Sequence, residues 1–155
     1  MRRFLPLIFA AVLLVAVFVG TAYASVSKTT TQVKATQQLA PRVTCSGSEC
    51  NGLDPEATGC AADAYTVKAP GGTVSFRTGY VELRYSPRCG TNWARVISTV
   101  GSARLMVSIR RTTDGLFYFA VGSGVRLWTP MVYAPNVKAK GCGSANNYED
   151  CTEGI

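Results

Sequence analysis

Cysteines and acidic residues are concentrated in one short stretch of the chain, CSGSECNGLDPEATGC, at residues 45–60. Side chains of these types could bind a metal ion, catalyse a hydrolysis or close a disulfide-bonded turn. Zinc sites commonly place Cys or His in closely spaced pairs. This chain has no histidine, and the separations between Cys45, Cys50 and Cys60 do not follow that pattern. The spacing therefore argues against zinc.

A calcium loop is a closer match to the same stretch. Its oxygen ligands and turn glycine would come from Asp54, Glu56, Thr58, Gly59 and Asp63. However, Tyr65 stands where an EF-hand would place its closing glutamate, so the match is partial. Asp54-Pro55 is more simply interpreted as a turn, with Thr58 as a cap for a helical turn through Cys60–Ala64. We therefore expect no bound metal and no organic cofactor.

The N-terminus has the pattern of a secretory signal. Met1–Arg3 is basic, residues 4–19 are almost all apolar, and Ala22-Tyr23-Ala24 supplies small residues at a cleavage site. An uncleaved membrane anchor is the alternative, because the apolar run approaches the roughly 20 residues that span a bilayer. Pro6 and the short apolar core favour cleavage. We predict a signal peptide over 1–24 and a secreted, extracellular product.

The remaining chain is long enough for one domain of ordinary size. Residues 25–44 are rich in Thr, Gln and Lys and hold no aromatic residue, so we predict a flexible linker there. A single domain is expected over 45–155. Loss of Arg2 and Arg3 with the signal would lower the net charge from +7 to +5. This mild excess is compatible with weak attraction to anionic wall polymers, but spread-out arginines favour an ordinary solvated surface.

Six cysteines in an exported chain predict three disulfides. Six cysteines can pair in many ways, and the sequence does not choose among them. The preferred set joins Cys60 to Cys89, Cys142 to Cys151, and Cys45 to Cys50. The first bond closes about 30 residues, which the chain-entropy description values at roughly 3.6 kcal/mol.

Hydrophobic residues with a period of two predict an all-β domain. Val81, Leu83 and Tyr85 alternate with Glu82 and Arg84. In the same way, Leu105, Val107 and Ile109 alternate with Arg104, Met106, Ser108 and Arg110. Asp114-Gly115 is the strongest hairpin signal, and Ser86–Cys89 could form a helical turn. We expect a small antiparallel barrel or sandwich, disulfide-stabilised, with one or two short helical turns. The remaining predicted strands are 65–68, 73–77, 95–98, 116–121, 125–128 and 131–133.

Two carboxylates facing one another could hydrolyse a glycan. Glu82 lies in a strand pattern, and Asp54 or Asp63 could supply its partner. Without histidine, the chain lacks the commonest general base and the usual Ser or Cys triad. Structural carboxylates outnumber catalytic ones, so we favour a cross-strand arginine pair for Glu82, or plain exposure to solvent. We expect no enzyme activity, with a carboxylate-based hydrolase of extracellular glycans as the alternative.

Aromatic side chains interleaved with arginines could instead bind a glycan or an anionic polymer. The aromatic residues are Trp93, Trp128, Tyr80, Tyr85, Tyr118 and Tyr133. Aromatic residues on strands belong to the core more often, and we expect Trp93 to pack over the disulfide of Cys89. The candidate ligand-facing residues are Glu82, Arg84, Asp54 and Trp128.

These patterns favour a non-enzymatic binding module at or outside the cell surface. Its ligand would be a cell-wall polymer, a glycan or a protein. A secreted protease inhibitor that presents residues 110–115 as a rigid loop is a second alternative. We expect a monomer, no sequence-specific nucleic-acid binding, and membrane attachment only through an uncleaved signal segment.

Three stretches closely resemble a bacterial domain-of-unknown-function family, number 2690. They are the motif at 45–60, residues 81–89 with 92–95 after them, and Thr129–Tyr133 as a closing strand. The resemblance spans about residues 45–142. It implies export, or a position outside the membrane behind an anchor in longer chains with a cytoplasmic DNA-binding domain, which we do not expect here. The family has no established activity, so the resemblance implies location and fold but no mechanism.

Overall fold

The computed structural model describes residues 42–154. The predicted signal peptide lies outside this range, as does the predicted linker up to residue 41. The last linker residues already contact the domain, because the Thr44 N–H donates to the Thr58 carbonyl at 3.0 Å and Val43 packs against buried cysteines. The folded chain therefore begins slightly before Cys45.

The first sheet, called sheet A, is built around a long antiparallel hairpin. Its two long strands pair from Gly79↔Ser98 to Ser86↔Thr91. Two short strands continue the sheet on each side of this hairpin, so that each outer edge is split in two. The strands are β1 (Tyr65–Thr66) and β2 (Thr73–Phe76) beside β3 (Gly79–Ser86), and β7 (Arg126–Trp128) and β8 (Val132–Tyr133) beside β4 (Thr91–Ser98).

The second sheet, called sheet B, has four antiparallel strands in the order β10-β9-β5-β6. They are β5 (Ala103–Arg111), β6 (Phe117–Gly124), β9 (Ala139–Ala145) and β10 (Tyr148–Cys151). The predicted hairpin at Asp114-Gly115 is confirmed, since β5 and β6 pair up to Arg110↔Phe117. Gly115 has φ +75°, a conformation that favours glycine in such a turn.

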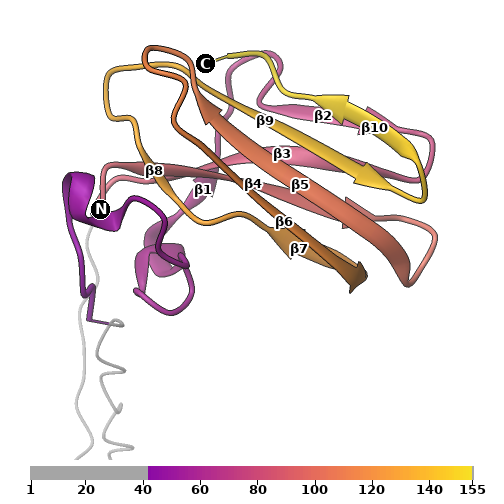
Figure 1. The fold of residues 1–155 in the computed structure, drawn as a ribbon, viewed down its shortest axis with the longest axis horizontal. Helices are drawn as coiled ribbons and strands as arrows, with labels where there is room; N and C mark the ends of the chain where they lie inside the picture. Colours follow the sequence, from indigo (N-terminus) through magenta and orange to yellow (C-terminus); the bar gives the residue numbers. More distant parts are fainter. Residues whose placement is uncertain (1–41, 155) are drawn as a thin grey trace, which may run out of the picture. The chain divides into compact units, whose positions relative to one another are not determined.

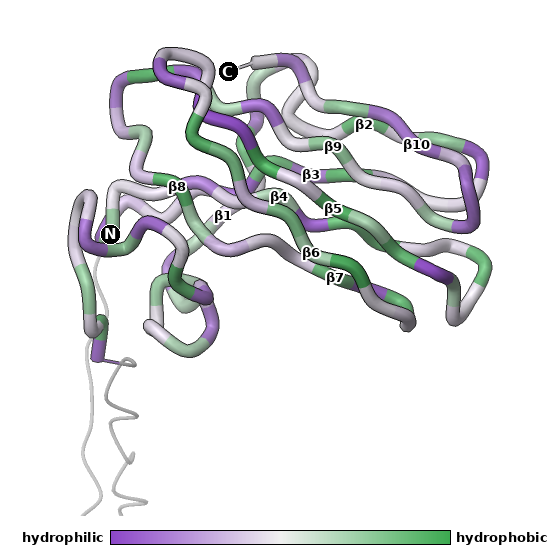
Figure 2. The backbone as a smooth tube through the Cα atoms, in the orientation of Figure 1, coloured by the Kyte–Doolittle hydropathy of each residue, from purple (hydrophilic) through white to green (hydrophobic). Residues whose placement is uncertain are grey.

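The two sheets lie face to face, which makes the fold a sandwich rather than a barrel (Figure 1). Alternate side chains of β3 and β5 point into the space between the sheets and are buried. Figure 2 shows hydrophobic residues along β5. The largest buried side chains of this core are Val81 and Leu83 from β3, Val96 from β4, and Leu105 and Ile109 from β5. The period-two pattern of the sequence thus places the core correctly.

The strands β9 and β10 were not predicted, because we interpreted residues 142–151 only as a tail pinned by a disulfide. They form a hairpin whose turn is Asn146-Asn147, with φ +49° and +72°. The strand β9 is rich in glycine and alanine, which have low strand propensity. Tight packing explains these small residues, because a Cβ at Gly143 would lie 3.0 Å from Val81 Cβ and Val96 Cβ.

Two predicted helical turns differ in detail from the structure. At the end of β3 the chain makes a hydrogen-bonded turn, with Gly90 N–H donating to the Ser86 carbonyl at 2.8 Å. Pairing of β3 with β4 continues to Ser86↔Thr91, so too few residues remain for a helix. The short helices are η1 (Gly47–Cys50) and η2 (Cys60–Asp63). Thr58 does not cap η2, because its hydroxyl donates to the Asp54 carbonyl at 2.8 Å.

Candidate functional site

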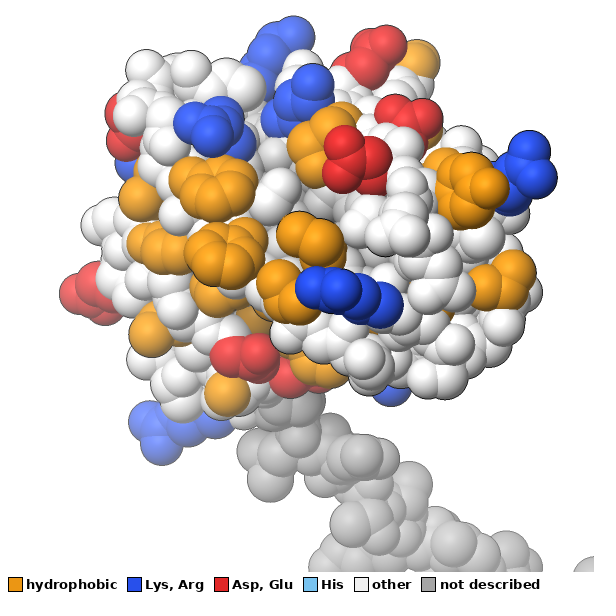
Figure 3. Space-filling model, turned by 45° about the vertical axis from the view of Figure 1, so that its right-hand side comes forward, with side chains coloured by type: hydrophobic (Ala, Val, Ile, Leu, Met, Phe, Trp, Pro, Cys, Tyr) orange, Lys and Arg blue, Asp and Glu red, His pale blue; other side chains and the backbone are white. Residues whose placement is uncertain are grey.

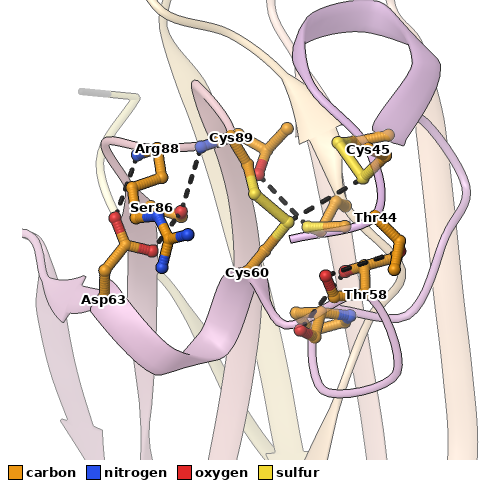
Figure 4. Close-up of a disulfide and its surroundings, with 12 residues drawn as sticks. Thr44, Cys45, Thr58, Cys60, Asp63, Ser86, Arg88 and Cys89 are labelled. Carbon is orange, nitrogen blue, oxygen red and sulfur yellow. Dashed lines mark hydrogen bonds between the residues drawn. A yellow bond between two sulfur atoms is a disulfide. The ribbon is translucent and has the colours of Figure 1, made fainter. Parts of the chain in front are cut away.

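The cysteine-rich stretch is a disulfide-bonded cap on one end of sheet A. Its bonds are Cys45–Cys50 and Cys60–Cys89, while Cys142–Cys151 joins β9 to β10; this is the set preferred from the sequence. Backbone hydrogen bonds hold the cap as well, from Gly47 N–H to the Cys89 carbonyl at 3.0 Å and from Gly52 N–H to the Met131 carbonyl at 2.9 Å. The stretch at 45–60 therefore acts as a staple, as Figure 4 shows around Cys60 and Cys89.

The sulfur atoms of Cys45, Cys50, Cys60 and Cys89 lie within 4.8 Å of one another. All four are joined in disulfides, so none is available as a thiolate ligand while these bonds persist. This is the only cluster of potential metal-binding side chains found between residues 42 and 154.

The carboxylates of the calcium hypothesis have other partners. Asp54 accepts hydrogen bonds from the N–H groups of Glu56 and Ala57 at 2.8 and 2.9 Å. Asp63 accepts from the Ser86 hydroxyl at 2.7 Å and from the Arg88 N–H at 2.9 Å (Figure 4). Both side chains hold turns in place, which is the simpler interpretation made from Asp54-Pro55.

The four candidate ligand-facing residues lie together at the outer face of sheet A. Register places Glu82 of β3 opposite Arg95 of β4, and Arg95 opposite Trp128 of β7. Asp54 reaches this group from the cap, since the Trp128 indole N–H donates to its carboxylate at 3.0 Å. Arg84 lies two residues along β3 on the same face.

A chain of hydrogen bonds links these side chains. Arg95 donates to one carboxylate oxygen of Glu82 and forms an ion pair with it, with Nη2–Oε2 2.7 Å. The other Glu82 oxygen accepts from the Thr66 hydroxyl at 3.2 Å. Thr66 in turn accepts from Arg84 at 2.7 Å, and the Ala64 carbonyl accepts from Arg84 at 2.9 Å. Both oxygens of Glu82 are therefore occupied, as the cross-strand arginine interpretation requires.

Arg84 is a guanidinium whose own hydrogen-bond partners are uncharged. Its Nε is buried and has no hydrogen-bond partner within residues 42–154. The pKa of Arg84 is lowered from its ordinary value, mainly because burial desolvates the guanidinium and also because Arg95 adds a second positive charge. Glu82 and Glu56 act on this pKa in the opposite direction. Burial and the charge of Arg95 thus make the protonated form of Arg84 less favourable than in water.

A small hollow of about 60 Å³ opens between these residues and the cap. Arginines from three adjacent strands line it, together with two tryptophans and two cap residues. The lining residues are Arg84, Arg95, Arg126, Trp93, Trp128, Glu56 and Ala61. We call this the arginine hollow. Its volume suits one carboxylate or phosphate group rather than a whole sugar, and arginine is well adapted to bind either anion.

Most of the other aromatic candidates belong to the packing. Trp93 is 3% exposed and packs with the disulfide-bonded cysteines of the cap, as expected. Tyr118 packs against the core, and Tyr85 makes an edge-to-face contact with Tyr65 at 5.8 Å. These aromatic residues therefore do not form one stacking surface, and only Trp93 and Trp128 line the arginine hollow.

The proposed inhibitor loop is fixed by its own contacts. Arg111 pairs with Asp114 and also donates to the Tyr133 carbonyl at 2.6 Å. This bonding raises the pKa of Arg111 and lowers that of Asp114 below its usual range. These are ordinary contacts of a hairpin turn.

A second surface, not predicted from the sequence, lies on the outer face of sheet B. Four large apolar side chains are exposed there, and we call them the apolar face: Met106, Phe117, Phe119 and Val121. The alternation in β6 could have revealed it, because Tyr118, Ala120 and Gly122 face the core and the larger residues therefore face outward.

No helix between residues 42 and 154 has the length and hydropathy needed to cross a bilayer. No curated protein and no solved structure matches the chain. The sequence profile of a family described as "Protein of unknown function (DUF2690)" matches residues 48–142. The match runs from the cap through both sheets into β9. The chain therefore belongs to this family of proteins of unknown function.

Proposed function

We propose that the protein is an exported, non-enzymatic binding module whose arginine hollow binds the anionic group of a cell-wall polymer. The observation that carries this proposal is the convergence of Arg84, Arg95 and Arg126 on one hollow beside Trp128. A carboxylate or phosphate would enter the hollow, and the neighbouring part of the polymer would lie over the indole.

The charge balance of the hollow supports an anionic ligand. Glu82 is committed to Arg95 and Thr66, and Asp54 to Trp128 and the cap backbone. Arg126 is exposed and forms no ion pair within the described part of the chain. Glu56 also lines the hollow and acts electrostatically on Arg84, but it forms no ion pair within residues 42–154. Arg84 and Arg126 therefore have no bonded carboxylate, and an anion between them would relieve the repulsion between Arg84 and Arg95.

Export is supported by the predicted signal peptide and by the use of all six cysteines in disulfides, which persist in oxidising compartments. A binding role without catalysis is supported by the hydrogen bonding of Glu82. For Glu82 to act as an acid or base, its contacts with Arg95 and Thr66 would have to break.

The test compares the chain from Ser25 onward with two single variants of equal charge. Residues 42–154 hold both sheets, the buried core and all six cysteines, so this chain contains what the fold requires. The probes are polygalacturonate, polyphosphate and neutral dextran. Binding of each polymer is measured by the change in tryptophan fluorescence of the protein. We expect Arg126→Gln to weaken binding of the anionic polymers about tenfold, as loss of one charge-assisted hydrogen bond implies. Arg104→Gln, on sheet B, should leave it unchanged.

A third variant has the opposite expected sign. Glu82→Gln frees Arg95, so we expect it to bind the anionic polymers more tightly. If neither polymer binds the unaltered chain, or if Arg104→Gln weakens binding as much as Arg126→Gln, the proposal is wrong. Loss of a glycan-hydrolysing activity in folded Glu82→Gln would instead support the hydrolase alternative.

A further inference from the structure

The apolar face of sheet B is the second surface of the molecule that calls for a partner. Phe119 is 64% exposed, Val121 51%, Met106 49% and Phe117 43%. These side chains come from two adjacent strands and lie on one side of sheet B. Three of them, Met106, Phe117 and Phe119, line a hollow of about 240 Å³ whose lining is largely apolar. Large contiguous apolar surface on an exposed face commonly marks an interaction site.

Positive charges stand at both ends of this face. At one end, register places Arg110 of β5 between Phe117 of β6 and Lys140 of β9. At the other end Arg104 lies opposite Ser123. All three cations are exposed, and Arg110 lies over the Phe117 ring at 4.9 Å. Figure 3 shows hydrophobic side chains gathered beside Lys and Arg side chains on the side that carries β5, β6 and β9.

We propose that the apolar face docks on an anionic lipid bilayer, with its apolar side chains at the acyl boundary and its cations at the headgroups. Charge complementarity carries the choice of partner. Exposed apolar side chains flanked by Lys and Arg combine the two forces that hold peripheral proteins on such surfaces. Glu149 is the only charged residue that lines the hollow itself. The three cations Arg104, Arg110 and Lys140 lie at the two ends of the face, outside this lining.

The arrangement fits other occupants less well. A second copy stacked face to face would bring cations against cations, because both ends of the face are positive. A glycan would need polar side chains to hydrogen-bond its hydroxyl groups. The outward positions of β6 from Phe117 to Val121 are instead all apolar. This proposal and the proposed function have only the predicted export in common. Export would bring the domain to the outer surface of the membrane.

The test is co-sedimentation of the chain from Ser25 onward with lipid vesicles. We expect binding to vesicles of phosphatidylcholine with phosphatidylglycerol, and much weaker binding to phosphatidylcholine alone. Phe117→Ser with Phe119→Ser should reduce partitioning at least tenfold. Arg104→Gln with Arg110→Gln should reduce it by a similar factor on the anionic vesicles. All four side chains are exposed, so these variants should fold.

Matched controls separate this proposal from the first. Lys68→Gln with Arg88→Gln removes the same charge from exposed positions outside both the arginine hollow and sheet B, and should leave vesicle binding unchanged. Leu53→Ser, an exposed apolar residue of the cap, should also have no effect. Equal partitioning of the unaltered chain and the phenylalanine variant would overturn the proposal. So would a dimer that the phenylalanine substitutions convert to a monomer without vesicle binding, because a second copy would then cover the face.

Discussion

Arg111 and Asp114 form an ion pair at the tip of the β5–β6 hairpin, and this contact sets a pH dependence. The hydrogen bond from Arg111 is the main cause that lowers the pKa of Asp114 below its ordinary value of 3.8, and the hydrogen bond from the Leu116 N–H is the second. A carboxyl group with a depressed pKa stabilises the folded state above its unfolded pKa, and this contribution is lost as pH falls through the folded pKa. The affected window therefore lies below about pH 4.

We predict that Asp114→Asn is less stable than the unaltered chain at neutral pH and that the difference narrows below pH 3.8. The effect should be small, because the side chain of Asp114 is 51% exposed. Urea unfolding over a pH series measures it. Glu149→Gln, at an exposed carboxylate outside any ion pair between residues 42 and 154, is the control. A difference that stays constant down to the lowest pH would contradict the prediction.

At the scale of single residues, candidate ligand-binding side chains could be chosen from the sequence, but which of them contact one another could not. The sequence identified Glu82, Arg84, Asp54 and Trp128 separately, and the structure brings them into one hydrogen-bonded group. Arg126 was not identified as a candidate, because its place beside the others depends on β4 lying between β3 and β7. A pairing between strands far apart in the sequence cannot be read from local patterns.

Among the strands, the long amphipathic ones were predictable and the small-residue ones were not. In β5 the large apolar residues Leu105, Val107 and Ile109 recur at every second position, so the buried side of the strand follows from the sequence. The strand β9, Ala-Lys-Gly-Cys-Gly-Ser-Ala, has its small residues on the buried side. Glycine in β9 allows the two sheets to pack closely. In a sequence, however, glycine is usually taken as a sign of a turn or of the end of a strand.

We predict that Gly143→Ala destabilises the fold by about 1–3 kcal/mol, the usual cost of overpacking a core. Its Cβ would lie 3.0 Å from Val81 Cβ, Val81 Cγ2 and Val96 Cβ, all in the opposite sheet. Gly122→Ala is the matched control, because its Cβ would lie 3.5 Å from the nearest Leu127 atom, an ordinary contact. Urea unfolding compares the two variants. Equal stability of both would mean that the sheets separate at no cost.

At the scale of the whole molecule, the three disulfides differ in what they join. Cys60–Cys89 ties the cap to the turn after β3, whereas Cys142–Cys151 joins two strands that are already paired. Cys45–Cys50 closes the shortest loop, within the cap itself. Cys60–Cys89 is therefore the bond that ties the cap to a part of sheet A distant from it in the sequence.

We therefore predict that the double alanine variant of Cys60 and Cys89 loses the most stability. Its bond spans 29 residues and is worth about 3.6 kcal/mol by loop closure. The bonds that span 9 and 5 residues are worth about 2.6 and 2.1 kcal/mol. Burial widens the gap, because Cys60 and Cys89 are at most 1% exposed, and their removal leaves a cavity beside Trp93. Urea unfolding of the three double variants gives the ranking. A larger loss for Cys142 and Cys151 than for Cys60 and Cys89 would mean that the C-terminal hairpin, and not the cap, limits the stability of the sandwich.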